Sequence, residues 1–350
     1  MSVYILKGEI MKVLFFRIGA IGDVLLTTGA VKAFKKAFPD CEVHYMAGRS
    51  AARILENNPY IDKLIIFEEK FMKVPRFMRA FLMASAIKKS IAPYYDYFID
   101  FESSHYTAMI AAAVKAGKKA GFLITGKNRG YNRFYRIRFD YRQKNEYIAR
   151  KYGALLSIFG IKQPESINPV LKLTQEEILQ GAKFYEDNVI KRPVIHVCIS
   201  GTWITKKWPV EKWKELLPML AQNFDVIVLW GPGDEKDLSE LTALKIPGIY
   251  FTPSLGLRQL AAVLSFGKLL ITNDNGVRHI AGALALKTIG LFGPTNEKGW
   301  ADINENNIVL TSDDNCRPCD KTSCPDLKCM TGITAQRVMS EAERILKTVF

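Results

Sequence analysis

Residues 269–295, LLITNDNGVRHIAGALALKTIGLFGPT, decide the fold of this chain. Residues 269–272 are a short apolar run, typical of a strand buried on both faces of a parallel sheet. The polar residues 273–276 end this run, residues 277–286 carry small and apolar side chains at helical spacing, and residues 288–292 form a second apolar run. The stretch therefore predicts a strand–helix–strand unit, in which ligands bind at the carboxyl ends of the strands.

Two side chains of this stretch are candidates for ligand binding. Asp274 lies where a carboxylate can accept a hydrogen bond from a ribose or sugar hydroxyl, beside a helix N-terminus that offers N–H groups to a phosphate. His279, one turn into the helix, can face the same pocket. The alternative is that Asp274 caps the helix and His279 packs beside it, and the turn alone does not decide between the two.

The length and charge of the chain limit its class. With 350 residues the chain is too long for one ordinary core, so two domains are expected. Its net charge of +14 and isoelectric point near 9.4 indicate an acidic partner: nucleic acid, an anionic lipid surface or a phosphorylated substrate. No window has the apolar length of a membrane-spanning helix and no signal peptide opens the chain, so we expect a cytoplasmic protein. Met11 precedes the first strand, and residues 1–10 are a candidate disordered extension.

Strands and helices alternate along the chain, which predicts doubly wound parallel sheets. Residues 160–171 contain two prolines and are expected to link two similar α/β domains, residues 11–165 and 166–350, with a cleft between them. The last helix is expected at 338–349, where it can pack back on the first domain. The other expected strands are 12–16, 42–46, 63–67, 94–101, 193–199, 225–230 and 248–251, and the other expected helices are 24–38, 51–57, 104–115, 146–159, 176–188, 210–222, 237–244 and 257–266.

The first loop of the chain is Gly19-Ala20-Ile21-Gly22-Asp23. It resembles a dinucleotide-binding fingerprint only loosely, because the third glycine is missing and the acidic residue stands at the helix start. This disfavours a dehydrogenase. A carboxylate at the carboxyl end of the first strand, held ionised by the helix N-terminus, suits a base that takes a proton from a hydroxyl nucleophile. Capping of the helix by Asp23 is the alternative.

Two loops of the second half are candidates for binding a phosphorylated ligand. Gly201-Thr202 supplies N–H and hydroxyl donors, and Lys206 or Lys207 can reach the same anion before the helix that begins near Trp208-Pro209. Farther along, Asp234 or Glu235 can bind a ribose, or either can cap the following helix.

Four cysteines, Cys316, Cys319, Cys324 and Cys329, form a C-x2-C-x4-C-x4-C pattern. Clustered thiols in a cytoplasmic protein suggest a structural zinc or iron–sulfur site, although only the first pair has the usual ligand spacing and no histidine lies nearby. The other two cysteines, Cys41 and Cys198, are expected in the core.

The first half contains two basic segments. Residues 70–89 mix Phe, Met and Leu with lysines and arginines, as interfacial helices do. Residues 115–151 carry twelve Lys and Arg against Asp140 and Glu146, with aromatic residues between them, which fits nucleic acid or an anionic lipid head group. A solvated surface is the alternative. His105 can line the same cleft as Asp23, whereas the histidines inside strands, His44 and His196, are expected to be structural.

With these motifs in place, the chain resembles glycosyltransferase family 9, the lipopolysaccharide heptosyltransferases. The resemblance covers most of residues 11–345 and rests on three motifs in order. These are RIGAIGD at 17–23 with its helix, GT at 201–202 with KKWP at 206–209, and NDNG at 273–276 through His279 to FGPT at 292–295.

The resemblance implies a fold and an activity. The fold is GT-B, two Rossmann-like doubly wound domains facing across a cleft. The activity is transfer of a heptose, with inversion and without a required metal or other cofactor, from an ADP-heptose donor to the inner core of lipopolysaccharide. An acceptor built on anionic lipid A suits the basic first half. The implied location is peripheral, on the inner face of the cytoplasmic membrane.

The resemblance also implies roles for individual residues. Asp23 would be the general base. Gly22, next to Asp23, and His105, which can line the same cleft, are the acceptor-side candidates. Lys206 and Thr202 would contact the donor diphosphate. Four further residues would complete the donor site: Asp274 at the sugar, and Asn275, Gly276 and His279 near the diphosphate. Glu235 is the candidate ribose ligand from its place in the loop.

The chain departs from the family pattern at two positions. Gly29 stands where the family usually has proline, and Asn275 stands where it often has threonine or serine. Because Asn275 lies in the expected donor pocket, another nucleotide sugar or glycan acceptor remains an alternative. A nucleic-acid-binding α/β protein is the alternative from another class, but Asp23 and Asp274 would have no role with a polyanion, so no nucleic acid is expected.

Overall fold

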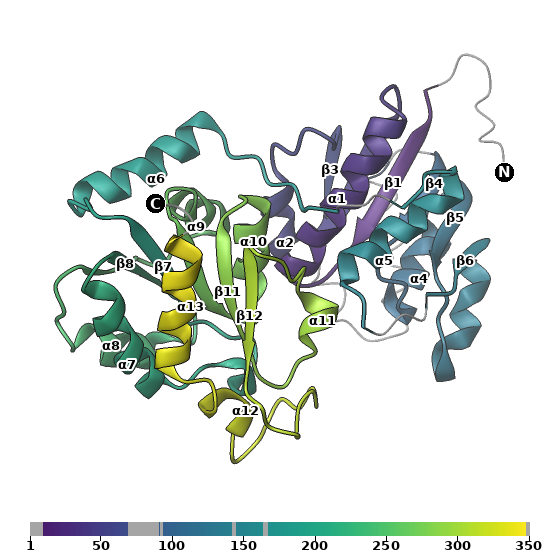
Figure 1. Ribbon diagram of the computed structural model, residues 1–350. Coiled ribbons are helices and arrows are strands. Elements are labelled where there is room, and N and C mark those ends of the chain that lie inside the picture. The colour runs from purple at the N-terminus through teal and green to yellow at the C-terminus, as the bar shows by residue number, and fades with distance from the viewer. Residues whose placement is uncertain (1–9, 69–90, 92–93, 142–144, 164–166, 348–350) are drawn as a thin grey trace. The chain divides into compact units, whose positions relative to one another are not determined.

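A computed structural model describes residues 10–68, 91, 94–141, 145–163 and 167–347 (Figure 1). The chain divides into two compact units, residues 1–172 and 173–350. Two predictions lie outside the described residues. These are nine of the ten residues of the candidate extension and the whole of the basic segment 70–89. No helix within the described ranges is long and apolar enough to cross a membrane.

The first unit contains a parallel six-stranded sheet with the strand order β3-β2-β1-β4-β5-β6. This is the order of a doubly wound Rossmann-like sheet, and its winding reverses between β1 and β4. The strands are β1 (Lys12–Arg17), β2 (Glu42–Gly48), β3 (Lys63–Phe67), β4 (Tyr95–Asp100), β5 (Ala116–Phe122) and β6 (Ile137–Phe139). The helices are α1 (Ile21–Ala37), α2 (Arg49–Ala52), η1 (Arg53–Leu55), α4 (His105–Ala113), η3 (Gly126–Phe134), α5 (Ile148–Ala154) and η4 (Leu155–Phe159).

The second unit repeats this topology with the strand order β12-β11-β10-β7-β8-β9, so its winding reverses between β7 and β10. Its strands are β7 (Val194–Cys198), β8 (Asp225–Leu229), β9 (Ile249–Phe251), β10 (Leu269–Asn273), β11 (Lys287–Phe292) and β12 (Asn307–Thr311). Its helices are α6 (Gln175–Asp187), η5 (Ile204–Lys206), α7 (Val210–Ala221), α8 (Glu235–Thr242), α9 (Leu257–Leu264), α10 (Gly276–Ala283), α11 (Glu297–Trp300), α12 (Lys328–Thr331) and α13 (Ala335–Lys347).

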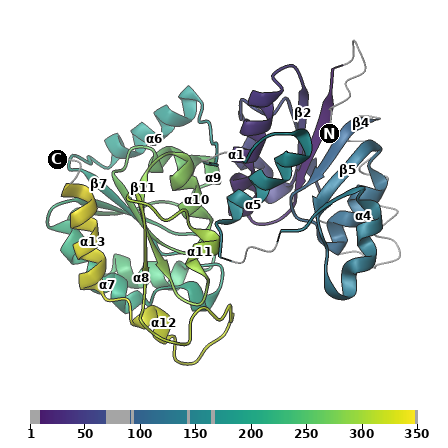
Figure 2. The same cartoon turned by 45° about the vertical axis from the view of Figure 1, so that its right-hand side comes forward.

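Helices cover both faces of the second sheet. Figure 2 shows α9 and α10 on one side of the strands and α7, α8 and α13 on the other. The last helix, α13, contacts α7 and β11, and its apolar side chains join the core of the second unit. The apolar face of α13 is therefore buried in the core of the second unit.

The main difference from the sequence-based prediction lies in the basic segment 115–151. Its first residues form β5 and its later residues form β6, two strands that we did not predict. Lysines interrupt the apolar pattern of β5, but their side chains bond locally: Lys118 Nζ lies 3.3 Å from the Tyr97 hydroxyl, and Lys119 Nζ donates to the Ala111 carbonyl at 2.6 Å. The expected helices 51–57 and 146–159 are each split into a short α-helix and a 3₁₀-helix.

The segment expected to link the domains is bound to α1 of the first unit. Val170 N donates to Thr28 Oγ1 at 2.7 Å, and Ile167 is buried. A Cβ on Gly29 would lie 2.7 Å from Cγ2 of Ile167 and 2.8 Å from the Asn168 carbonyl oxygen, so no side chain fits there. The close approach of residues 167–168 explains the glycine that departs from the family pattern.

His196 in β7 is fully buried, and its Nε2 lies 3.0 Å from the Tyr185 hydroxyl. Gly267 makes room for the ring, because a Cβ there would lie 2.2 Å from Nδ1 of His196. Burial lowers the pKa of His196 to about 3. The ring is therefore neutral in the folded protein at pH values where the unfolded chain protonates it.

This difference predicts a pH dependence of stability. The unfolded histidine has a pKa of about 6.5, so the contribution of His196 is complete above that pH and is lost as the pH falls toward the folded value. Between about pH 6 and pH 4, we expect the free energy of unfolding to fall about 1.4 kcal/mol per pH unit more steeply in the wild type than in His196→Gln. Urea unfolding at several pH values measures both slopes. Tyr185→Phe, which keeps the histidine, should retain the steeper slope, and parallel curves for wild type and His196→Gln would contradict the assignment.

Candidate active site

Asp23 lies at the edge of the first sheet where the winding reverses between β1 and β4. It is in the first turn of α1, and the N-cap position is occupied by Ala20. The Asp23 carboxylate pairs with Arg17, the last residue of β1, with 3.0 Å between Oδ2 and Nη2. Asp23 is therefore an ion-paired carboxylate at the sheet edge, whereas the capping alternative would have placed it at the N-cap.

The two acceptor-side candidates lie at the same edge of the first sheet. Gly22 is a buried residue of α1, next to Asp23. His105 begins α4 after β4, and its ring centroid lies 3.8 Å from that of Tyr106 and 6.0 Å from that of Tyr131. His105 thus belongs to an aromatic group, and its contact with an acceptor stays a prediction.

The second site lies at the carboxyl ends of β7 and β10, where the winding of the second sheet reverses. Lys206, at the end of η5, places Nζ 2.7 Å from Oδ2 of Asp274, which follows β10. Thr295, after β11, donates its hydroxyl to the same oxygen at 2.8 Å. The Lys206 and Asp274 side chains are only 14% and 7% exposed, so three loops meet at a nearly buried ion pair.

Asn275, not Asp274, caps α10. The Asn275 side chain accepts the N–H groups of Val277 at 2.9 Å and Arg278 at 3.4 Å, and its amide donates to the Ser200 carbonyl at 2.8 Å. Gly276 is the first residue of the helix. Capping therefore leaves the Asp274 carboxylate available to other partners, and a phosphate at this helix end would compete with Asn275 for two of the N–H groups.

The turn before α10 is tied to the loop after β7. The Asn273 side chain accepts from Trp208 N at 3.0 Å and donates to the Ile199 carbonyl at 2.9 Å. Thr202 lies on this loop with an exposed side chain. The loop that carries Thr202 and Lys206 is thus held against the loop that carries Asp274.

Arg278 is a site residue that we did not predict. It is 3% exposed, its guanidinium carbon lies 5.2 Å from the Phe292 ring centroid, and Nη2 lies 4.0 Å from Oδ1 of Asp274. Its place one helical turn after Asp274 is the sequence signal that could have found it. Asp274 therefore has two cations nearby, Lys206 and Arg278.

His279 is also buried. Burial fits both expectations, a ring that faces the pocket and a ring that packs beside Asp274, so its contact with a ligand stays a prediction. Burial lowers the pKa of His279 well below its usual value, and Arg278 and Lys206 act in the same direction. The imidazole is therefore neutral at physiological pH, so the positive charge of this site comes from Lys206 and Arg278.

The acidic residues after β8 have separate roles in the structure. Asp234 is buried, accepts from the Ser200 hydroxyl at 2.5 Å and from Gly231 N at 3.0 Å, and pairs with Lys207. Glu235 begins α8 and accepts from Gly233 N at 2.9 Å. Lys207 thus pairs with the loop after β8, whereas Lys206 pairs with Asp274. The ribose contact of Glu235 stays a prediction.

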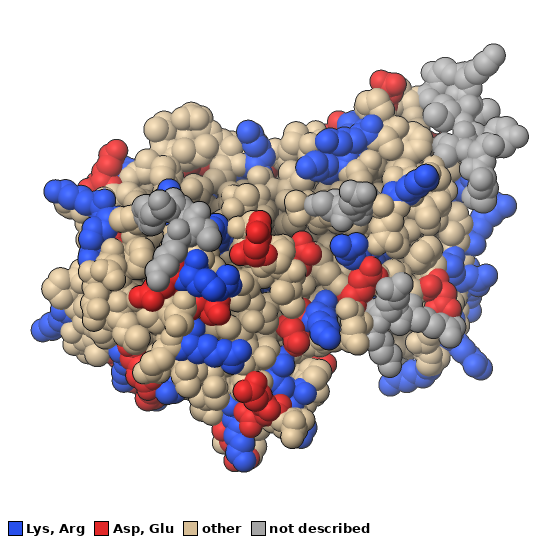
Figure 3. Space-filling model, viewed as in Figure 1, with Lys and Arg blue, Asp and Glu red and all other residues tan. Residues whose placement is uncertain are grey.

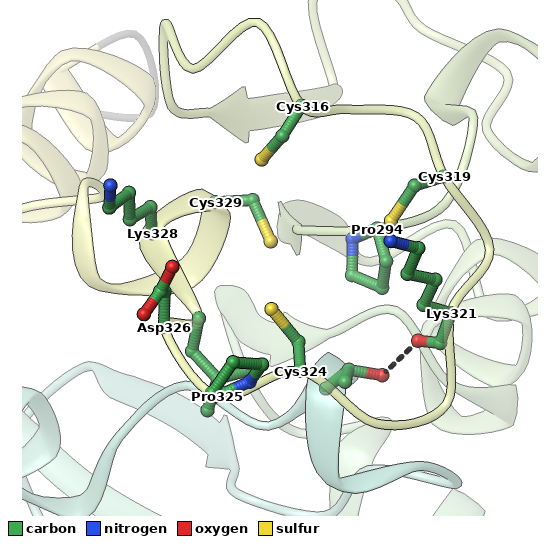
Figure 4. A pocket seen from close by; sticks show the side chains of 11 residues that line it. Pro294, Cys316, Cys319, Lys321, Cys324, Pro325, Asp326, Lys328 and Cys329 are labelled. Atoms are coloured by element: carbon green, nitrogen blue, oxygen red, sulfur yellow. Dashed lines mark hydrogen bonds between the residues drawn. The ribbon is translucent and has the colours of Figure 1, made fainter.

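All four clustered cysteines line one cavity of about 370 Å³ in the second unit (Figure 4). Burial raises the pKa of Cys329, and the three other cysteines raise it further. Nevertheless, the described part of the chain contains no group of three or more His, Cys, Asp or Glu arranged to hold a metal ion, so the suggested zinc or iron–sulfur site is not supported.

The cysteine loop is attached to η5, because the Thr205 hydroxyl donates to the Lys321 carbonyl at 2.7 Å. Cys41 and Cys198 are buried, as predicted.

The basic segment forms a charged surface on the first unit. Figure 3 shows Lys and Arg side chains, in blue, around the end of this unit where Figure 1 places β5 and β6. The aromatic residues between them are explained by packing, since Tyr135 is buried and Tyr131 and Phe134 pack against the same core. The exposed cations of η3, of β6 and of the two residues between them, which we call the basic surface, are Lys127, Arg129, Arg133, Arg136 and Arg138.

Two doubly wound Rossmann-like units in one chain define the GT-B fold, and the comparisons with known proteins agree. The sequence model of glycosyltransferase family 9 (heptosyltransferase) matches residues 84–330. The chain therefore belongs to glycosyltransferase family 9, and it is a glycosyltransferase.

Individual relatives match over nearly the full chain. Lipopolysaccharide heptosyltransferase 1 of Pseudomonas aeruginosa is 25% identical, and the match covers 96% of this chain and 98% of that protein. The solved family 9 structure from Veillonella parvula has a TM-score of 0.86 at 20% identity and covers 99% of this chain and 100% of that one. Escherichia coli heptosyltransferase WaaC with ADP-2-deoxy-2-fluoro heptose has a TM-score of 0.73 at 20% identity and covers 95% and 99%.

Proposed function

We propose that this protein is an inverting heptosyltransferase that moves a heptose from ADP-heptose to the inner core of lipopolysaccharide. The observation that carries the proposal is the nearly buried Lys206–Asp274–Thr295 cluster, with Arg278 nearby, at the β7/β10 edge. A carboxylate beside two cations can accept hydrogen bonds from sugar hydroxyls while the cations face a diphosphate. The names of the relatives supply the identity of the sugar and of the acceptor.

In the proposed reaction, Asp23 takes the proton of the acceptor hydroxyl. The hydroxyl oxygen bonds to the anomeric carbon of the donor as the bond from that carbon to the diphosphate oxygen breaks, and the electron pair of the broken bond leaves with ADP. Lys206 stabilises the negative charge that develops on the leaving diphosphate, together with Arg278 and the hydroxyl of Thr202. Asp274 orients the donor sugar, Glu235 binds the ribose, and Asn275, Gly276 and His279 line the diphosphate end.

Isothermal titration with ADP, UDP and GDP tests the donor half of the proposal. We expect binding of ADP alone, without added divalent metal, because the cations of the site belong to the protein. A preference for UDP or GDP would keep a transferase but exclude ADP-heptose, and absence of nucleotide binding would reject the proposal. Mass spectrometry of a lipid acceptor incubated with ADP-heptose then tests transfer directly.

We further propose that the basic surface holds the protein on the anionic inner face of the cytoplasmic membrane, where the lipid A acceptor lies. Each arginine near an anionic bilayer contributes about 1 kcal/mol. Arg129→Glu with Arg136→Glu should therefore reduce sedimentation with phosphatidylglycerol vesicles strongly, while ADP affinity stays unchanged. Lys245→Glu with Lys268→Glu, at two exposed lysines of the second unit, serves as the matched control because it changes the net charge by the same amount. Two outcomes would contradict this role: equal vesicle binding by the wild type and the double arginine variant, or preferential binding of RNA over vesicles by the wild type.

A further inference from the structure

The guanidinium of Arg17 lies between two carboxylates at the β1/β4 edge of the first sheet. Nη2 is 3.0 Å from Oδ2 of Asp23, and Nη1 is 3.6 Å from Oε2 of Glu102. Glu102 follows β4, which pairs with β1, so the strand order brings it beside Arg17. The two carboxylates contact different nitrogens of one cation.

This group is largely shielded from solvent. The side chains of Arg17, Asp23 and Glu102 are 14%, 18% and 26% exposed. Gly19 lies beside the pair, since a Cβ there would lie 3.7 Å from Oδ2 of Asp23 and 4.0 Å from Nη2 of Arg17. Shielding strengthens each charge interaction within the group.

The surrounding charges favour an ionised Arg17. Burial alone lowers the pKa of Arg17, but Tyr152, Asp23 and Glu102 together raise it above its usual value. Burial raises the pKa of Glu102; Arg17 opposes this effect, whereas Asp100 and Asp23 add to it. Two more groups face the Arg17 charge, Tyr45 on β2 and Lys151 on α5.

We propose that Arg17 positions Asp23, and that Glu102 makes Asp23 a stronger base by partly neutralising the positive charge of Arg17. The inference rests on the proposed role of Asp23 as general base. A carboxylate held at Oδ2 keeps Oδ1 for the incoming proton. An arginine next to a carboxylate stabilises its ionised form and makes it a weaker base. A second carboxylate beside the same arginine weakens this effect and makes the first carboxylate a stronger base.

Glu102 also has a role after proton transfer. When the acceptor O–H bond breaks and the proton joins Asp23, the Arg17–Asp23 ion pair loses its negative partner. Glu102 remains as the counterion of Arg17, so the shielded guanidinium is not left uncompensated. Arg17 and Glu102 act through Asp23 and are positioning residues.

The test is the pH profile of kcat/KM for the acceptor, measured in variants of the two positioning residues. Glu102→Gln leaves the whole Arg17 charge on Asp23, so the acidic limb should move to lower pH by about half a unit to one unit and kcat should fall about three- to thirtyfold. Arg17→Met removes the charge, so the limb should move to higher pH. Donor KM should stay unchanged in Glu102→Gln, and Glu102→Asp should restore part of kcat.

Glu42→Gln is the matched control, because it removes a carboxylate from the same sheet at the opposite, amino end of β2. The thermal unfolding transition reports whether each variant of the first unit has folded, since ADP affinity is a property of the second unit, and Arg17→Lys keeps the charge if Arg17→Met does not fold. If the acidic limb of the pH profile does not move in Glu102→Gln or in the Arg17 variant, the positioning roles are overturned. The proposed base still stands in that case, provided that Asp23→Asn lowers turnover. Normal turnover of Asp23→Asn would instead overturn the proposed general base itself.

Discussion

Asp23→Asn should keep the affinity for ADP and lower kcat about 10²- to 10⁴-fold, the usual contribution of a general base. Asparagine has nearly the shape of aspartate and can still place an oxygen near Arg17, so the loop should stay folded. It cannot accept the proton of the acceptor hydroxyl, however, so the transfer step loses its base. Single-turnover kinetics with ADP-heptose separate this loss from donor binding.

The matched control for this prediction is Asp62→Asn. Asp62 also pairs with a cation of the first unit, Lys35, with 2.8 Å between Oδ2 and Nζ, but it lies before β3. It should therefore change stability without a comparable change in kcat. Turnover of Asp23→Asn at the wild-type rate would exclude Asp23 as the base.

Lys206→Ala should weaken ADP binding about tenfold to a hundredfold and lower kcat about 10²- to 10³-fold. Two effects add in this variant. The diphosphate loses its lysine contact, and Asp274, with a 7% exposed side chain, loses the partner 2.7 Å from its oxygen. Arg278, 4.0 Å away, then compensates the Asp274 carboxylate only in part, so the carboxylate repels the ligand. Titration with ADP and steady-state kinetics measure the two losses.

A double-mutant cycle separates these effects. Lys206→Ala combined with Asp274→Asn removes the negative charge of Asp274 as well, so it should recover part of the ADP affinity that Lys206→Ala loses, although not the turnover. Lys212→Ala, a partly buried lysine of α7 whose Nζ lies 2.9 Å from Oε1 of Glu215, is the control for the loss of a lysine ion pair elsewhere in the unit. Unchanged ADP affinity in Lys206→Ala would remove Lys206 from the donor site.

Local sequence patterns were sufficient for most of the alternation of strands and helices, although they missed β5, β6 and β12. The buried runs of β7, β8, β10 and β11 are apolar and short, and Gly, Pro, Asn or Asp mark the turns after them. Because residues after a parallel strand lie at the carboxyl edge of the sheet, the same patterns placed Asp23, Lys206 and Asp274 at such edges. The resemblance to glycosyltransferase family 9, which the family comparison confirms, rested on those residues.

The tertiary structure alone decided which of these residues meet. Lys206 and Lys207 are neighbours in sequence, yet one pairs with Asp274 and the other with Asp234. Glu102 reaches Arg17 only because β4 pairs with β1, and no local pattern encodes that pairing. Local periodicity determines elements because it reflects short-range burial and turn geometry, whereas partners depend on strand order, which is set by packing between distant segments.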